Sequence, residues 1–364
     1  MKKFLKIILC LLPALVLTVG AYAAYVLIDY DRLEDMLVLE TANPFAPEAR
    51  TEDFEILKAG EEKRILSWNI GFGAYTADYS FFMDGGREAR ARTPIDCEFA
   101  ASSVMTEAEN TGADFVLVQE VDEYGTRSHH VNQRAMLESG KPLWSTVFAQ
   151  NYDSSYLFYP FHQPIGANRS GMMTMSRFEI ESALRRSLPV EGGFNKFFDL
   201  DRCYSVSRIP VDNGKTLCLY NLHLSAYTSD GSIATEQLAI LLEDMAAEYA
   251  AGNYVIAGGD FNKDLWGDSS VYTGIPITEA SWAQPFPMEL LPEGIILVDS
   301  LNPEKPVASC RDAGEPYMPG KTFTLTLDGF MISDNVELVS CGVLDRGFAV
   351  SDHNPVVMDF ILKI

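Results

Sequence analysis

Short apolar runs alternate with segments of helical periodicity from Lys63 to the end of the chain. Apolar runs of about four to eight residues between turn signals predict buried strands, and apolar residues recurring every three or four positions predict helices. The strands are expected at Arg64–Ile70, Phe115–Val121, Met172–Ser176, Tyr204–Ile209, Thr216–His223, Tyr254–Ala257, Thr322–Ile332 and Pro355–Leu362. The helices are expected at Cys97–Asn110 and Ile233–Ala251.

The alternation of strands and helices predicts a single α/β domain over residues 63–364. A prior of about 150 residues per domain would allow two domains in 364 residues. However, no Ser/Gly-rich linker and no internal repeat divides the region after residue 63. Residues 29–62 are acidic, weakly periodic and interrupted by Pro44 and Pro47, so we expect them to form a stalk.

The N-terminal segment is a candidate membrane anchor. Lys2, Lys3 and Lys6 precede an almost unbroken apolar run from Ile7 to Ile28, which is long enough to cross a bilayer. Cleavage after Ala23, which ends an Ala-Tyr-Ala sequence, would instead give a secreted protein. The run continues past that point, so residues 1–28 favour an uncleaved single-pass anchor. The lysines predict a cytoplasmic N-terminus and an extracytoplasmic domain.

Charge and cysteine content narrow the function classes. The net charge of −23 and the pI near 4.5 argue against a generic nucleic-acid-binding surface, which would carry a basic stripe. A small neutral or zwitterionic phosphoester would be repelled less than a polyphosphate. The six cysteines show no CxxC spacing, so neither a disulfide framework nor a zinc cluster is expected.

Polar residues gather at the predicted strand ends. In the sequence GGDFN, Asp260 and Asn262 lie two residues apart and therefore project to the same side of an extended chain. Each such residue alone is explained equally well by a turn or a cap. The same pattern recurs at Asn69, Gln119-Glu120, Asn221/His223, Asp328 and Ser351–Asn354. Converging carboxylates and amides suit a hard, oxygen-liganded cation such as Mg²⁺.

Seven motifs occur in the order LSWNI, VLVQEVD, SGMMTMSR, YNLHLSA, IAGGDFN, LDGFMIS and SDHNPV. In this order they resemble the endonuclease/exonuclease/phosphatase superfamily, which includes pancreatic-type deoxyribonucleases, bacterial sphingomyelinases and inositol-polyphosphate 5-phosphatases. The resemblance covers about residues 63–364. It implies a four-layer α/β sandwich with two packed mixed β-sheets flanked by helices, and a metal-dependent phosphoesterase activity.

The resemblance also implies a metal site. Glu120 looks like the principal ligand, Asn69 supports the metal or the phosphate, and Asp352 lies near the metal, directly or through water. The expected ion is Mg²⁺, with Mn²⁺ as the alternative.

The catalytic residues follow from the same motifs. Asp260 resembles the group that orients and deprotonates the attacking water, and Asn262 the donor to a phosphate oxygen. His353 would stabilise the pentacovalent phosphate, with Asp328 fixing its tautomer and orientation. His223 resembles a second histidine near the phosphate or the leaving group. Some relatives pair that histidine with an acid before the SR motif, but NRSGMMTMSR has none.

Substrate contacts are less sharply indicated. Arg177 of the SR motif and Arg311 are candidates for contact with a substrate phosphate. The stretch NYDSSYLFYPFHQPIGANR predicts either an aromatic wall beside the site or packing of a long loop. Residues 75–94 form either a rim loop or surface decoration. In RSHHVNQR, the histidines belong either to the rim or to a solvated helix start.

These observations predict a metal-dependent hydrolase of phosphoester bonds, displayed outside the cytoplasmic membrane, in which Asp260 activates water. A lipid headgroup or another small phosphoester is the favoured substrate, and extracellular nuclease activity on nucleic acid is the enzymatic alternative. A catalytically silent, membrane-displayed binding module is the alternative of another class. No protein partner can be inferred.

Overall fold

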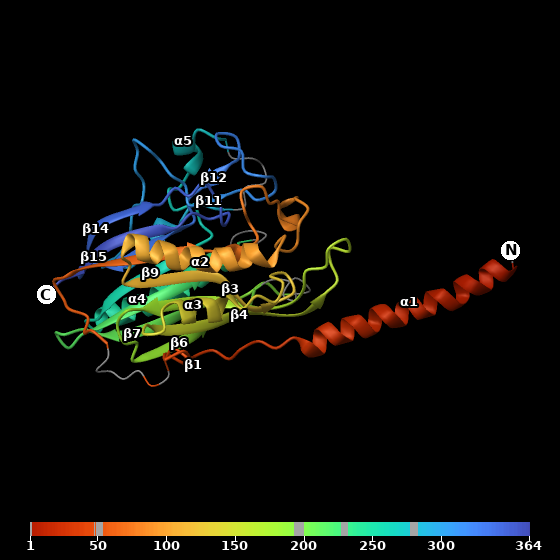
Figure 1. Cartoon of the computed structure of the whole chain (residues 1–364), viewed down its shortest axis with the longest axis horizontal. Coiled ribbons are helices and arrows are strands. Elements are labelled where there is room, and N and C mark those ends of the chain that lie inside the picture. The colour runs from red at the N-terminus through yellow and green to blue at the C-terminus, as the bar shows by residue number, and fades with distance from the viewer. Residues whose placement is uncertain (1, 47, 49–53, 193–199, 227–231, 277–282) are drawn as a thin grey trace.

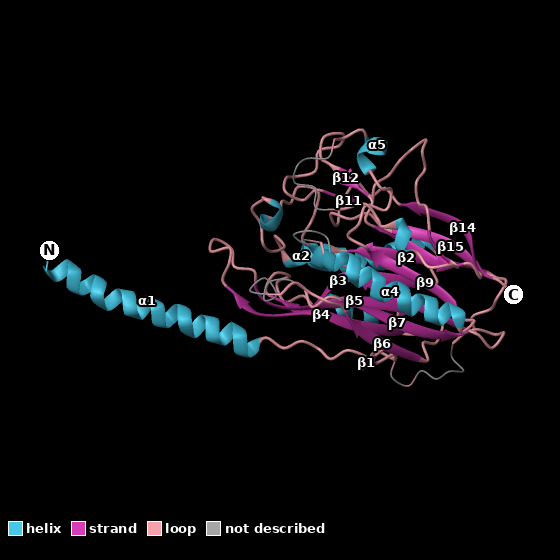
Figure 2. Ribbon diagram, turned by 180° about the vertical axis from the view of Figure 1, so that it is seen from behind, coloured by secondary structure: helices cyan, strands magenta, loops and turns pink. Residues whose placement is uncertain are grey.

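The computed structural model describes residues 2–46, 48, 54–192, 200–226, 232–276 and 283–364. Two β-sheets pack face to face, and helices cover their outer faces (Figures 1 and 2). Helix α1 (Lys2–Asp29) projects away from this body. The predicted α/β fold with two mixed sheets and flanking helices is confirmed.

The larger sheet has seven strands in the order β1-β6-β7-β8-β9-β13-β10. Their bounds are β1 Leu37–Leu39, β6 Ser182–Ser187, β7 Cys203–Pro210, β8 Thr216–His223, β9 Tyr254–Asp260, β13 Asp328–Ser333 and β10 Ile295–Leu297. Strands β8 and β9 are parallel, and the other neighbouring pairs are antiparallel. Both β8 and β9 therefore end at the same edge of the sheet.

The second sheet has six strands in the order β14-β15-β2-β3-β5-β4. Their bounds are β14 Val336–Val343, β15 Val356–Leu362, β2 Glu62–Asn69, β3 Phe115–Gly125, β5 Gly166–Ser176 and β4 Ser145–Leu157. Strands β2 and β3 are its parallel pair. A separate two-stranded ribbon joins β11 (Cys310–Arg311) to β12 (Thr324–Leu325).

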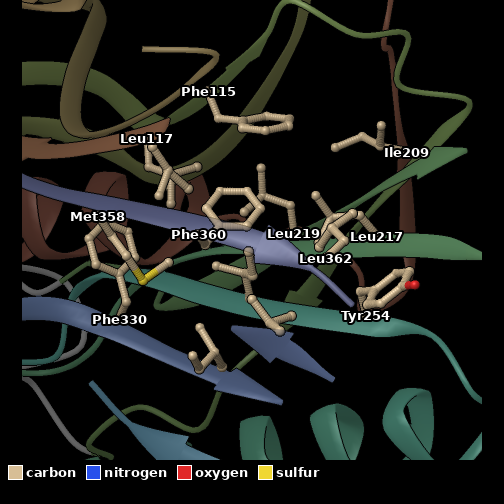
Figure 3. Close-up of a cluster of buried hydrophobic side chains, with 14 of the residues drawn as sticks. Phe115, Leu117, Ile209, Leu217, Leu219, Tyr254, Phe330, Met358, Phe360 and Leu362 are labelled. Carbon is tan, nitrogen blue, oxygen red and sulfur yellow. The ribbon is translucent and has the colours of Figure 1, made fainter. Parts of the chain in front are cut away.

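Apolar side chains from the inner faces of both sheets form the central core. Figure 3 shows Phe115 and Leu117 of β3 in the same cluster as Leu219 of β8 and Phe330 of β13. On the outer face of the six-stranded sheet, α2 (Pro94–Thr111) and α3 (Gln133–Gly140) close a second cluster. Helix α4 (Ser232–Ala250) covers the seven-stranded sheet in the same way. This packing holds the parallel pair β2–β3 of one sheet against the parallel pair β8–β9 of the other.

Local signals explain the helix ends. Thr93 and Asp96 form a reciprocal capping box at the start of α2, and Gly112 ends the helix in the left-handed conformation. In the described part of the chain the shorter helices are α5 (Ser269–Thr273) and the 3₁₀ turns η2 (Gly71–Gly73), η3 (Phe82–Asp84) and η5 (Met288–Leu290). The predicted helices at 97–110 and 233–251 correspond to α2 and α4.

One predicted strand is interrupted, and several were missed. The expected strand Thr322–Ile332 splits into β12 and β13, because the carbonyls of Thr326 and Leu327 bond to Leu265 and Phe261 in the loop after β9. The missed strands include β14, whose middle is exposed, and β4, whose sequence is rich in Ser, Asn and Gln. Neither presents the apolar run that reveals a buried strand.

The predicted stalk contacts the domain. Within residues 29–62, β1 pairs with β6, Asn43 Nδ2 donates to the carbonyls of Glu138 and Lys141, and Leu57 is fully buried in the core. A free-standing stalk over the whole segment does not fit these contacts, because each removes the segment from solvent. The boundary near residue 63 stays a prediction.

Helix α1 contains a 19-residue span, Leu11–Asp29, that is long and apolar enough to cross a membrane. Its position near the N-terminus fits either an anchor or a signal sequence. Among its described side chains, the apolar ones are mostly exposed.

We predict that Gly259→Ala destabilises the domain, because β9 must pass very close to β8. Gly259 has φ +142°, and a Cβ there would lie 2.1 Å from the carbonyl oxygen of Leu222. The free energy of unfolding should fall by roughly 2 kcal/mol or more, measured by chemical denaturation of the full chain. Gly342→Ala in β14, where a Cβ meets open space, should change it by less than about 0.5 kcal/mol. Equal effects of the two substitutions would contradict this account.

Candidate active site

The ends of the two parallel strand pairs meet at one place. Asn69 ends β2 and Glu120 lies in β3 just beyond its pairing with β2. His223 and Asp260 end β8 and β9 and are direct register partners. Asp328, the first residue of β13, is also a register partner of Asp260. The structure therefore gathers these residues from five strands of two sheets.

Asn69 connects the carboxylates of the two sheets. Its Nδ2 donates to Glu120 Oε1 at 3.2 Å and to Asp260 Oδ2 at 3.0 Å, and its Oδ1 accepts from the Gly71 amide at 3.0 Å. Glu120 has φ +55° and Asn262 has φ +48°. Such left-handed backbone is uncommon for residues other than glycine and tends to occur at functional sites.

His353 and Asp328 form a buried pair. His353 Nδ1 donates to Asp328 Oδ2 at 2.7 Å, and Ser309 Oγ donates to the same carboxylate oxygen at 2.7 Å. His353 Nε2 lies 3.8 Å from Asp260 Oδ2. Burial opposes a charged imidazole, but Asp328 and Asp260 outweigh it and raise the pKa of His353 well above its ordinary value. His353 is therefore a cation at neutral pH, with Nε2 facing Asp260.

Burial and the charge of Asp328 raise the pKa of Asp260 from 3.8 to about 7. Its Oδ1 accepts from the backbone amide of Asn262 at 2.9 Å. Asn262 Nδ2 donates to the carbonyl of Leu224 at 2.7 Å, so contact with a phosphate oxygen requires that bond to be exchanged. A carboxyl group that titrates near neutrality can both take up and release a proton there.

His223 differs from His353. Burial, together with the positive charges of Arg202 and His353, lowers the pKa of His223 well below its ordinary value, so its imidazole is neutral. Its Nε2 lies 3.6 Å from Asp260 Oδ2. No described residue bonds to its Nδ1, which is buried. The acid that would orient this ring in some relatives has no counterpart among the described residues.

The donor set fits a divalent cation. Burial raises the pKa values of Glu120 and Asp352, and repulsion from Asp352 adds to the effect on Glu120. Burial therefore makes the charged form of both carboxylates costly, and a bound cation would offset that cost. Ligand atoms of Asp260, Asp328 and His353 also lie within 4.8 Å of one another and could hold a metal ion if His353 gave up a proton. Carboxylate oxygens are the ligands that divalent ions such as Mg²⁺ and Mn²⁺ prefer.

The two arginines that were predicted to contact the substrate lie in different places. Arg177 lies at the opposite end of the sheet, where it is half-exposed and pairs with Glu55 at 3.3 Å and Asp114 at 3.6 Å. Its expected contact with substrate is wrong, because β5 runs antiparallel to β3 and carries its C-terminal end away from Glu120. Arg311 lines the cavity, but its Nη atoms donate to backbone carbonyls, including those of Thr76 and Asp312. It holds the 75–94 loop in place.

Arg127 was missed, although RSHHVNQR drew attention to its neighbours. Its side chain is buried in the cavity wall, over the ring of Phe72 at 4.0 Å from the ring centre. Nε and Nη2 donate to the two oxygens of Asp122 at 3.2 and 2.8 Å, and Nη1 bonds to no described residue. His129 and His130 are exposed and do not line the cavity. Of the residues in this motif, only Arg127 lines the cavity.

The cavity walls come from two segments whose roles were left open. Tyr75, Phe81 and Met83 belong to the 75–94 loop, which is therefore a rim loop. Tyr152 and Ile165 belong to the aromatic stretch and also line the cavity, with Ile165 packed beside Ala89 of the rim loop. The floor consists of the polar residues described above, which are Glu120, His223, Asp260, Asn262, Asp352 and His353.

Comparison with known proteins agrees with this geometry. A model of the endonuclease/exonuclease/phosphatase family matches residues 66–353, most of the chain. The chain belongs to the endonuclease/exonuclease/phosphatase family. Members of this family are metal-dependent phosphoesterases, and the buried Asp260, Asp328 and His353 group is consistent with that chemistry.

Solved structures of the family share the fold. An endonuclease/exonuclease/phosphatase from Beutenbergia cavernae is 18% identical with a TM-score of 0.54, and the match covers 83% of this chain and 72% of that one. ANGEL2, a 2′,3′-cyclic phosphatase, is 17% identical with a TM-score of 0.55 and coverages of 83% and 96%. TDP2 from D. rerio, solved with a single-stranded DNA product, is 15% identical with a TM-score of 0.52 and coverages of 82% and 99%. No curated protein matches the sequence.

We predict that Asp260→Asn changes how stability depends on pH when metal is removed. Because folding raises the pKa of Asp260 from 3.8 to about 7, the folded chain binds this proton more tightly than the unfolded chain. Asp260 therefore stabilises the fold only when protonated, and its contribution is lost as pH rises from about 4 to 7. In EDTA, the melting temperature of the variant should rise relative to wild type across this range. A difference that does not vary with pH would contradict the assignment.

Proposed function

We propose that this chain is a metal-dependent phosphoester hydrolase that uses an Asp260-activated water. The observation that carries the proposal is the convergence of Asp260 with the His353–Asp328 pair and, through Asn69, with Glu120. In-line attack on phosphorus needs a base beside the water and positive charge beside the phosphate oxygens. Asp260 would be the base, and His353 would supply positive charge.

Each polar residue of the cavity floor has a separate role in the proposed reaction. Asp260, with its pKa near 7, takes the proton from the attacking water. His353, kept cationic by Asp328, donates from Nε2 to the charge that develops on the phosphate. Asn262 donates to a phosphate oxygen after exchanging its bond to Leu224. His223, being neutral, serves better as a hydrogen-bonding contact than as a general acid.

Glu120 and Asp352 would hold the metal, with Asn69 positioning Glu120. When bound, the metal supplies Lewis-acid stabilisation of phosphate charge and lowers the pKa of water. Its positive charge would also offset the burial that raises the pKa values of both carboxylates. Mg²⁺ is the favoured ion and Mn²⁺ the alternative.

Arg127 is the strongest candidate for substrate binding. Two hydrogen bonds to Asp122 fix the guanidinium in the cavity wall. Nη1 takes part in neither of them and is held in one position by the rigid, planar group. A fixed arginine suits recognition of phosphate oxygens. This role replaces the one expected for Arg177.

We further propose that α1 is an uncleaved anchor and that residues beyond it lie outside the cytoplasm. The support is the length of the apolar span and the lysines that precede it. A lipid headgroup or another small phosphoester fits the net charge of −23 better than nucleic acid does. The complete set of acid, base and histidine residues argues against a silent binding module.

Asp260→Asn should abolish most phosphoesterase activity. A panel of a chromogenic diester, a monoester, phospholipids and plasmid DNA, with Mg²⁺ and with EDTA, first identifies a hydrolysed substrate. Loss of the base should lower kcat by about 10²–10⁴-fold. Arg177→Ala is the matched control and should retain wild-type kinetics, since Arg177 lies at the far end of the sheet. Wild-type turnover by Asp260→Asn, or equal turnover in EDTA, would refute the proposed mechanism.

The domain should be accessible from outside the cell. Protease added to intact cells or protoplasts should digest the chain beyond about Asp29 while α1 stays with the membrane fraction. A cytoplasmic protein serves as the control for cell integrity. Full protection, or a mature soluble form that begins at Ala24, would contradict the anchor.

A further inference from the structure

The hairpin between β4 and β5 contacts the C-terminal part of α1. Tyr22 Oη donates to the carbonyl of Tyr156 at 3.1 Å, and the Tyr156 amide donates to Tyr25 Oη at 3.1 Å. The rings of Tyr22 and Phe158 meet edge to face with centres 5.3 Å apart. The hairpin is therefore held at a defined position along the apolar helix.

The tip of this hairpin exposes aromatic side chains. Phe158 is 52% exposed, Tyr159 57% and Phe161 85%. Exposed aromatic rings in a cluster are costly in water and mark an interaction surface. Tyrosine and phenylalanine are also residue types that bind at the boundary between headgroups and acyl chains.

The contacts with α1 set the depth of the tip. Tyr22 lies seven residues before Asp29, where α1 ends, which is about 10 Å along the helix axis. If α1 spans the bilayer up to Ile28, a side chain that touches Tyr22 lies below the level of the helix end. Phe158 is such a side chain. The tip then lies at the depth of Tyr22, inside the membrane boundary set by the end of α1.

The active site faces the same side. Asn69 ends β2 close to the start of β15, and the C-terminus lies beyond the far end of that antiparallel strand. Figure 1 shows α1 and the hairpin on the side opposite the C-terminus, which is the side of the strand ends that carry the site. Tyr159 packs on Phe82 of the rim loop at 5.8 Å, and Leu157 packs with Ile165, which lines the cavity. The aromatic tip and the cavity wall are thus one continuous structure.

We propose that the hairpin tip, defined by Phe158, Tyr159 and Phe161, docks into the membrane that holds α1, and that the site acts on the phosphoester of a lipid at that surface. The substrate half of this inference rests on the proposed function. Water adds to phosphorus, one ester P–O bond breaks, and the proton taken by Asp260 passes to the departing alkoxide. The acidic chain makes a lipid with a zwitterionic headgroup the favoured class.

Tryptophan quenching tests the docking. The full chain is reconstituted in phosphatidylcholine vesicles with or without brominated acyl chains, and Phe161→Trp is compared with wild type to subtract the four native tryptophans. Leu143→Trp is the matched control, since Leu143 is 69% exposed but lies beyond the other end of β4. The added fluorescence of Phe161→Trp should be quenched at least twofold more than that of Leu143→Trp. Equal quenching of the two variants overturns the docking.

A double variant, Phe158→Ser with Phe161→Ser, tests the substrate class. It should hydrolyse phosphatidylcholine in vesicles at least about tenfold more slowly than wild type, because burial of each of the two phenylalanines shifts an equilibrium by roughly tenfold or more. It should hydrolyse a water-soluble chromogenic diester at the wild-type rate. Equal losses on both substrates, or hydrolysis by wild type of the soluble diester but not of the lipid, overturn the lipid assignment. If wild type hydrolyses neither, the proposed function fails, while the quenching result still decides the docking.

Discussion

The rest of the site depends on the close approach of two sheets at the ends of their parallel strands. Asn69, at the end of one sheet, donates to Asp260 of the other and to Glu120 of its own. This arrangement requires the inner faces to be apolar and tightly packed, as the buried rings of Phe115, Phe330 and Phe360 show. Without that packing the carboxylates would sit on separate surfaces and would not share one centre of charge.

Burial then determines the electrostatics. Exclusion of water raises the pKa values of Asp260, Glu120 and Asp352. Burial alone would lower the pKa of His353, but its direct pairing with Asp328 raises that pKa and keeps the imidazole charged. The fold therefore gathers buried carboxylates beside the His353–Asp328 pair and close to Arg127. Such a cluster costs stability in the empty chain and favours binding of a divalent ion.

The segments outside the sheets enclose this centre. The rim loop and the β4–β5 hairpin form the cavity wall, and the hairpin continues into an aromatic tip that contacts α1. The hydrogen bonds between Arg127 and Asp122 have two effects. They orient the guanidinium, and they connect the loop after β3 to β3 itself.

Strand ends and motif order determined much of this protein by themselves. Buried strands such as β8 and β9 show as apolar runs, and polar residues that interrupt such runs stand out, which is how Asp260, Asp328 and His353 were identified. What tertiary structure alone decided is which polar residues converge. Arg177 and Arg127 both follow buried strands in sequence, but antiparallel pairing carries Arg177 to the far edge, while a turn after β3 returns Arg127 to the cavity. The spacing of residues in the sequence does not show at which end of the sheet each arginine lies. Strand order and pairing direction decide that, and both depend on contacts between residues far apart in the chain.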